Sequence, residues 1–133
     1  MQQSLSRFDL MRRILIIDDE DDIREVAALS LESVAGWSVL TACSGPEGIR
    51  AAHVEQPDAI LMDVMMPSMD GPTTFREMQR FPEIANIPVV LLTAKVQGVD
   101  QRRFAGLGVA GVLFKPFDPL TLAEQMAATL GWS

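Results

Sequence analysis

The sequence predicts an α/β fold in which a five-stranded parallel sheet is covered by helices on both faces. Short apolar runs alternate along the chain with amphipathic segments of helical period, which is the order of elements in such folds. The first run, at residues 14–17, is apolar at consecutive positions, as is typical of a strand buried on both faces. Several runs end in a charged or hydroxyl side chain, and parallel sheets bind ligands at the carboxyl ends of their strands.

The first strand and the first helix are predicted between residues 13 and 36. A continuous apolar run leads from Arg13 to Asp18, and a helix opens at Asp21 or Asp22. Gly36 closes this helix, because glycine readily adopts the left-handed conformation that follows a helix C-terminus. We expect the helix to bury its apolar positions, which are Ile23, Val26, Ala27, Leu31 and Val34.

The second strand is predicted at residues 37–42, and the second helix runs to about Val54. Ser44 and Glu47 have the spacing of a capping box, which satisfies free backbone N–H groups at a helix start. Cys43, at the end of the strand, is expected to fill the core. Because it is the single cysteine, an internal disulfide bond is excluded, and a reducing compartment is indicated.

The third strand, at residues 59–63, ends in Asp63. Asp70 and Gly71 then turn the chain into a helix that carries Phe75 and Met78 on its apolar face.

The last elements are strands at residues 88–93 and 111–115, with a polar helix at about 99–105 between them. The final helix is predicted to begin at Asp118 and Pro119, since proline suits the first turn of a helix. Its apolar face is expected to contain Leu122, Ala123, Met126, Ala127 and Leu130.

The composition excludes several classes of protein. The chain of 133 residues has a formal net charge of −7, whereas nucleic-acid binding requires clustered Lys and Arg. It contains neither an apolar segment of about eighteen residues nor a signal-peptide pattern, so we expect no membrane association and a cytoplasmic location. Residues 1–11 lack a clear period and are expected to be an N-terminal extension, followed by one domain at 12–133 and no output domain.

Chemically active side chains follow the predicted strands. Asp18 and Asp19 end the first strand. Asp63, Thr93 and Lys115 end the third, fourth and fifth strands, so we expect all five side chains to converge. Carboxylates placed together repel one another, and a hard divalent ion such as Mg²⁺ relieves that repulsion. With a cation and a hydroxyl nearby, the set predicts a cradle for a phosphoryl group, with Asp63 as the nucleophile.

Each of these residues alone has a simpler interpretation. Asp18 and Asp19 could cap the next helix. Thr93 could be an ordinary strand-end hydroxyl, and Lys115 a solvated charge. Their joint placement at four strand ends favours the functional interpretation. The single histidine, His53, is expected at the surface, and the methionines of the third strand and its loop are expected to be packing and loop residues.

Four short motifs occur in order at the predicted strand ends: IIDDEDD, DVMMPSMDG, LLTA and FKPF. Together they resemble bacterial response-regulator receiver domains of the stand-alone type, from about residue 13 to residue 130. The resemblance implies a flavodoxin-like, doubly wound sheet with the strand order 2-1-3-4-5. It also implies a phosphoacceptor switch of a two-component system or phosphorelay. The phosphoryl donor would be the phosphohistidine of a sensor histidine kinase or a histidine phosphotransfer protein.

The resemblance implies a role for each acid. Asp63 would be the phosphorylated residue. Asp19 and Asp63 would bind Mg²⁺ directly, and Asp18 would act partly through water. The backbone carbonyl of Met65 would complete the protein ligands.

The resemblance also implies how phosphorylation is sensed. Thr93 and Lys115 would hold the phosphoryl oxygens, and the bond between Lys115 and Pro116 would be cis. Members of the family often carry an aromatic residue three positions before this lysine, and it changes rotamer when the threonine moves. Here that switch position is Val112, whose side chain cannot make the same swing.

Two residues are expected to set the lifetime of the phosphorylated state. Met65 has no group that could orient a water, and the long cationic side chain of Lys95 could fold over the phosphoryl oxygens. Both features predict slow hydrolysis of phosphorylated Asp63.

Four functional classes are compatible with the predicted fold. A stand-alone receiver that alters its binding to a protein partner fits the whole site, and it would be no enzyme beyond self-catalysed phosphoryl transfer and slow autodephosphorylation. A dehalogenase-type phosphatase needs an acid at the position of Met65. A flavodoxin-like cofactor carrier needs a phosphate loop rich in Ser, Thr and Gly after the first strand, where this chain has five acids. The alternative is a binding module that keeps the fold and acts without phosphorylation.

Overall fold

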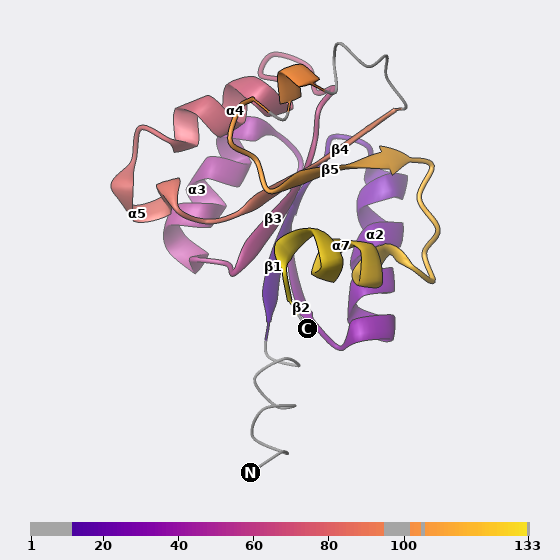
Figure 1. Ribbon diagram of the computed structural model, residues 1–133. Helices are drawn as coiled ribbons and strands as arrows, with labels where there is room; N and C mark the ends of the chain where they lie inside the picture. Colours follow the sequence, from indigo (N-terminus) through magenta and orange to yellow (C-terminus); the bar gives the residue numbers. More distant parts are fainter. Residues whose placement is uncertain (1–11, 95–101, 105, 133) are drawn as a thin grey trace.

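The computed structural model describes residues 12–94, 102–104 and 106–132 (Figure 1). The expected N-terminal extension and Lys95 lie outside the described residues. So does most of the helix expected at residues 99–105, of which residues 102–104 are described and helical.

The centre of the molecule is a five-stranded sheet with the order β2-β1-β3-β4-β5. All neighbouring strands are parallel, so their carboxyl ends lie at the same edge. The predicted fold class and the strand order implied by the resemblance are both confirmed. The strands are β1 (Arg13–Ile17), β2 (Ser38–Ala42), β3 (Ala59–Asp63), β4 (Val89–Ala94) and β5 (Gly111–Lys115).

Helices cover both faces of the sheet (Figure 1). The helices α2 (Asp21–Ala35) and α7 (Leu122–Leu130) pack together on one face. The other face is covered by α3 (Gly45–Glu55), α4 (Gly71–Met78) and the short α5 (Pro82–Ala85), which the sequence analysis did not predict.

Two hydrophobic layers form because successive side chains of a strand point to opposite faces of the sheet. In β1, Ile14 and Ile16 join the layer under α2 and α7. Leu15 and Ile17 join the layer under α3 and α4. All four side chains are buried, which is why the strand is apolar at every position from Ile14 to Ile17.

The helix ends follow the predicted signals. Gly36 is left-handed, with φ of 72°, and its N–H donates to the carbonyl oxygen of Glu32. The Ser44 hydroxyl accepts a hydrogen bond from the N–H of Glu47 at 3.2 Å and so caps α3. The Glu47 carboxylate reaches back to the N–H of Cys43 at 3.3 Å.

The prediction that Cys43 fills the core was wrong, because this residue is exposed. It follows β2, an edge strand whose outer positions are open to water. Its thiol instead donates a hydrogen bond to the carboxylate of Glu47 at 3.1 Å.

The predicted apolar face of α2 is also partly wrong, since Val26 and Val34 are exposed. The buried side of the helix is centred on Ala27 and Leu31 and includes Ser30. Burial of this serine is possible because its hydroxyl donates a hydrogen bond to the backbone carbonyl of Pro119.

The last helix begins later than predicted, at Leu122. The Asp118 carboxylate accepts a hydrogen bond from the N–H of Leu120 at 2.9 Å, and its carbonyl accepts from Thr121 and Leu122. Asp118 therefore organises a turn that precedes the helix.

Gly71 sets how closely α4 approaches the end of β3. A Cβ at this position would lie 2.6 Å from the carbonyl oxygen of Asp63 and 3.0 Å from the Cα of Val64. Because backbone atoms cannot move aside cheaply, we predict that Gly71→Ala lowers the free energy of unfolding by about 1–3 kcal/mol. Urea denaturation measures this change.

Gly106→Ala is the matched control, since a Cβ there would lie 3.5 Å from the nearest carbonyl oxygen, an ordinary contact. It should cost less than about 0.5 kcal/mol. Equal losses in the two variants would contradict the close-packing argument.

Candidate functional site

Four neighbouring strands place the predicted site residues at one edge of the sheet. Asp18 directly follows β1, and Asp63 is the last residue of β3. Thr93 lies one residue before the end of β4, next to Leu92, which pairs with Asp63. Lys115 is the last residue of β5. Since these strands are adjacent in the sheet, segments far apart in the sequence meet here.

Lys115 is the point at which the acids meet. Its Nζ lies 3.3 Å from Asp18 Oδ2, 3.2 Å from Glu20 Oε1 and 3.2 Å from Asp63 Oδ1. The lysine side chain is only 16% exposed, so these ion pairs are partly shielded from water. A single cation therefore holds three carboxylates together.

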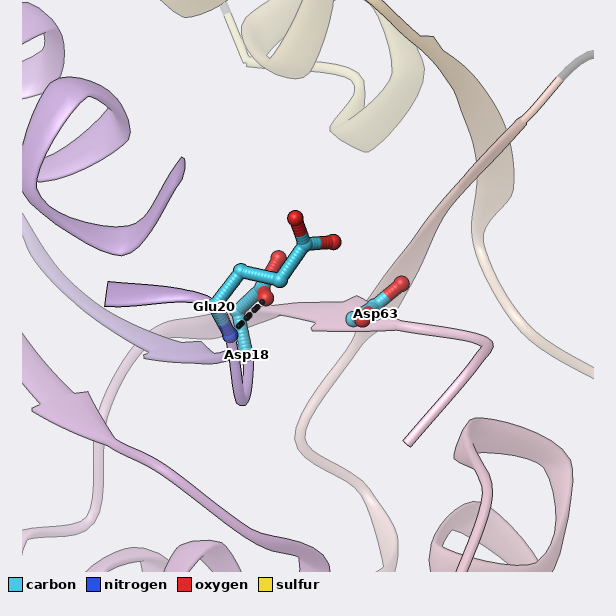
Figure 2. Close-up of side chains that lie close together, drawn as sticks. All are labelled: Asp18, Glu20 and Asp63. Atoms are coloured by element: carbon cyan, nitrogen blue, oxygen red, sulfur yellow. Dashed lines mark hydrogen bonds between the residues drawn. The ribbon is translucent and has the colours of Figure 1, made fainter. Parts of the chain in front are cut away.

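Figure 2 shows the acidic cluster that results, in which Asp18, Glu20 and Asp63 lie close together. One carboxylate oxygen of each lies within 4.8 Å of the others. The N–H of Glu20 also donates to Asp18 Oδ1 at 2.8 Å. Sequence reasoning missed Glu20, although it is the third acid of the run that begins at Asp18. Asp19, expected as a direct metal ligand, is not in this group within the described part of the chain.

Buried carboxylate oxygens at this edge lack hydrogen-bond donors among the described residues. They are Asp18 Oδ2, Asp19 Oδ1 and Asp63 Oδ2, of which Asp18 Oδ2 has the ion-pair contact with Lys115 Nζ at 3.3 Å. Leaving such a charged atom without a donor is costly unless a cation compensates it. Oxygen ligands from carboxylates are those that Mg²⁺ prefers, so the residues present fit such an ion.

Burial perturbs both central aspartates. It raises the pKa of Asp63 to about 6, and the negative charge of Asp18 adds to this effect. Lys115 and the N–H of Met65 oppose the rise. Burial likewise raises the pKa of Asp18 above its ordinary value. The site thus contains acids that resist ionisation, as functional sites often do.

The pKa of Lys115 is also raised, which for a lysine favours the charged form. Burial alone would lower the pKa of its ammonium group, but the charges of Asp18 and Asp63 outweigh burial and hold it above the ordinary value. The lysine is therefore a permanent cation at neutral pH.

The loop after β3 orients the central aspartate. The N–H of Met65 donates to Asp63 Oδ1 at 3.3 Å, and the N–H of Gly71 donates to the carbonyl oxygen of Val64 at 2.9 Å. The Met65 side chain is 74% exposed, whereas Met66 is buried in the core. The Met65 side chain is therefore exposed to solvent next to Asp63. The sequence analysis expected this side chain to affect the access of water to the site.

A cavity of about 200 Å³ adjoins the end of β3. Thr93, which is itself buried, forms part of its wall. Arg103 also lines the cavity. The complete lining is Val64, Met65, Asp70, Pro72, Thr93, Arg103 and Phe104.

The expected switch position, Val112, lies in β5 and pairs with Leu91. Its side chain is partly buried against the hydrophobic layer under α3 and α4. The bond between Lys115 and Pro116 is cis, as the resemblance implied.

The fold and the site together define a receiver-type protein. The family model described as response regulator receiver domain matches residues 14–127, and the chain belongs to this family. In the described residues, no helix combines the length and the apolar character that a membrane span requires.

Curated relatives include single-domain and larger proteins. Protein PilH of Pseudomonas aeruginosa is 36% identical over 120 residues, which make up 90% of this chain and 98% of that protein. The DNA-binding dual master transcriptional regulator RpaA of Synechocystis sp. is 38% identical over 120 residues, which make up 90% of this chain and 49% of that protein. The chain spans about half the length of the transcriptional regulators it matches.

Solved structures show the same fold. Chemotaxis protein CheY4 of Vibrio cholerae matches with a TM-score of 0.83 and 30% identity, covering 90% of this chain and 99% of that one. The receiver domain of sensor histidine kinase PA1611 of Pseudomonas aeruginosa matches with a TM-score of 0.79 and 28% identity, covering 91% and 98%. That structure has a magnesium ion coordinated in its active site cleft.

The raised pKa of Asp63 makes stability depend on pH. Its ordinary value is 3.8, so the folded state binds this proton more tightly than the unfolded state, and stability falls as pH rises from about 4 to about 6. We predict that Asp63→Asn, in metal-free buffer at about pH 7.5, raises the free energy of unfolding by about 1–3 kcal/mol. The gain should vanish below about pH 4, where the carboxyl group is protonated in both states.

Denaturant unfolding at several pH values measures this gain. Asp22→Asn removes an exposed acid from α2 and should give no comparable increase. A gain for Asp63→Asn that is the same at low and neutral pH would show that packing, and not ionisation, is responsible.

Proposed function

We propose that this protein is a phosphoacceptor switch that receives a phosphoryl group on Asp63 from a histidine kinase or a histidine phosphotransfer protein. The observation that carries the proposal is the contact between the buried Asp63 carboxylate and Lys115, 3.2 Å apart, beside carboxylate oxygens that lack donors. A purely structural strand end has no use for such an arrangement, because burying like charges destabilises the fold.

The proposed reaction is a displacement at phosphorus. A carboxylate oxygen of Asp63 attacks the phosphohistidine phosphorus, a new O–P bond forms, and the P–N bond to the donor breaks. The donor imidazole keeps the electron pair and takes up a proton. Lys115 neutralises charge on the phosphoryl oxygens, and the Thr93 hydroxyl, in the wall of the adjoining cavity, donates to one of them.

Mg²⁺ would be held by Asp18, Asp19 and Asp63, with the carbonyl oxygen of Met65. The buried oxygens without donors on all three aspartates support this ligand set. When bound, the ion neutralises negative charge on the phosphoryl oxygens during transfer. Glu20 is 59% exposed, unlike Asp18 and Asp63, so water can solvate its carboxylate and it would stay outside the direct ligands.

The consequence of phosphorylation would be altered binding to a downstream protein in the cytoplasm. The protein would not turn over a separate substrate, and it would lose its phosphoryl group slowly by hydrolysis. The alternative, a binding module that works without phosphorylation, predicts no use for the perturbed Asp63.

Acetyl phosphate labelling tests the acceptor. We predict that the wild-type protein gains the mass of one phosphoryl group in the presence of Mg²⁺, and that Asp63→Asn abolishes the gain. Lys115→Met should retain labelling at a reduced rate, because it removes a charge but not the nucleophile. Intact-protein mass spectrometry measures the result, and labelling of Asp63→Asn at another acid would overturn the assignment.

Thermal and chemical melts with Mg²⁺ test the metal site. Because the ion binds the folded state, it should stabilise the wild-type protein by roughly 2.7 kcal/mol at a hundred times its dissociation constant. Asp19→Asn should weaken Mg²⁺ affinity by about tenfold or more, since ligand loss is costly. Glu20→Gln is the control and should change the affinity much less.

Either of two results would contradict this ligand set. One is a melt that millimolar Mg²⁺ does not move. The other is a larger loss of affinity in Glu20→Gln than in Asp19→Asn.

A further inference from the structure

The proposed phosphoryl transfer does not involve Arg103. It lines the cavity of about 200 Å³ whose wall also contains Val64, Met65 and Thr93. Val64 and Met65 directly follow Asp63, so the cavity begins where the proposed phosphoacceptor ends. Arg103 is the one cationic side chain in the lining of this cavity within the described residues.

The other cation of the site is already engaged. Lys115 lies within 3.3 Å of oxygens from Asp18, Glu20 and Asp63. It is therefore already paired with three carboxylates, and it does not line the cavity. A phosphoryl group on Asp63 adds negative charge to a region where acids already outnumber cations.

Arg103 also lies near Asp70, which follows the phosphoacceptor loop. The hydrogen bond from Thr73 is the main cause that lowers the pKa of Asp70, and the charges of Arg76 and then Arg103 add smaller contributions in the same direction. Asp70 accepts the N–H of Thr73 at 2.8 Å as the N-cap of α4, so this acid is fixed by the backbone. Arg103 itself is exposed, whereas Asp70 is half-buried.

We propose that Arg103 is a phosphoryl-binding residue, which donates hydrogen bonds across the cavity to the oxygens of the phosphoryl group arriving at Asp63. This inference rests on the proposed function and adds a second cation to it, approaching from the Thr93 side. A guanidinium group suits this role because it stays charged and presents several N–H donors in a plane. Its exposed positive charge beside the cavity also attracts a dianionic donor before transfer.

The chain offers a matched control in the neighbouring Arg102. It has the same charge, is exposed, and does not line the cavity. Three variants separate the roles: Arg103→Gln removes the charge, Arg103→Lys keeps it, and Arg102→Gln removes the neighbouring charge. Each is treated with acetyl phosphate at fixed Mg²⁺ and increasing NaCl, and the second-order rate constant of labelling is measured by mass spectrometry.

We expect Arg103→Gln to lower this rate constant by about fivefold at low salt, the size of an exposed charge interaction of about 1 kcal/mol. Arg102→Gln should stay within about twofold, and Arg103→Lys should recover part of the loss. Added NaCl should slow the wild-type protein more than Arg103→Gln, because salt screens the interaction that the variant lacks. Beryllofluoride, a phosphoryl mimic, should bind Arg103→Gln more weakly by a similar factor.

Other outcomes separate this inference from the proposed function. Equal rates and equal salt dependence for Arg103→Gln and Arg102→Gln, with normal labelling at Asp63, would overturn the role of Arg103 alone. Absence of labelling in the wild-type protein would overturn the proposed function and, with it, this inference. A loss in Arg103→Gln that Arg103→Lys shares in full, and that salt does not change, would show a packing effect and count against the proposal.

Discussion

The whole site depends on one physical constraint, which is that like charges are buried together at the carboxyl edge of the sheet. Asp18 and Asp63 are 1% and 2% exposed, and Lys115 is the cation that contacts both. Burying a carboxylate is expensive unless charges and hydrogen bonds compensate it. One lysine compensates only part of this cost, as the raised pKa of Asp63 indicates. The energy that keeps these groups together must come from the rest of the fold.

The hydrophobic layers supply that energy and explain where the site lies. β1 and β3 are central strands, and every residue of β3 is buried. Strands that pack on both faces have little freedom to separate, so the acids at their ends cannot relieve their repulsion by moving apart. The loop after β3 is fixed in the same way, because Gly71 packs against the backbone of Asp63 and Asp70 caps α4. The position of Asp63 is therefore determined by packing, and its ionisation adapts to that position.

Much of this arrangement could be predicted because it depends on local sequence patterns. Consecutive apolar positions identify a doubly covered strand, and parallel strands bring their ends together, so Asp63 and Lys115 were expected to meet. Contacts between side chains of different helices, strands and loops could not be predicted in this way. Glu20 joins the cluster through a lysine that lies 95 positions later in the chain, and Arg103 reaches the cavity from a separate segment. Cys43 was misjudged although the implied strand order already placed the preceding strand at the edge of the sheet, where a residue can be exposed.

The same charge balance leads to a view of how such a switch can work. Before phosphorylation, Lys115 is shared among acids that include Asp18 and Asp63. On the proposed function, a phosphoryl group on Asp63 would add negative charge near the cavity that is lined by Thr93 and Arg103. Because unbalanced charge is costly in a low-dielectric site, cationic side chains would be attracted towards it. Val112 packs against the core and has no large side chain to swing, so the response to that charge would depend on Thr93 and these cations instead.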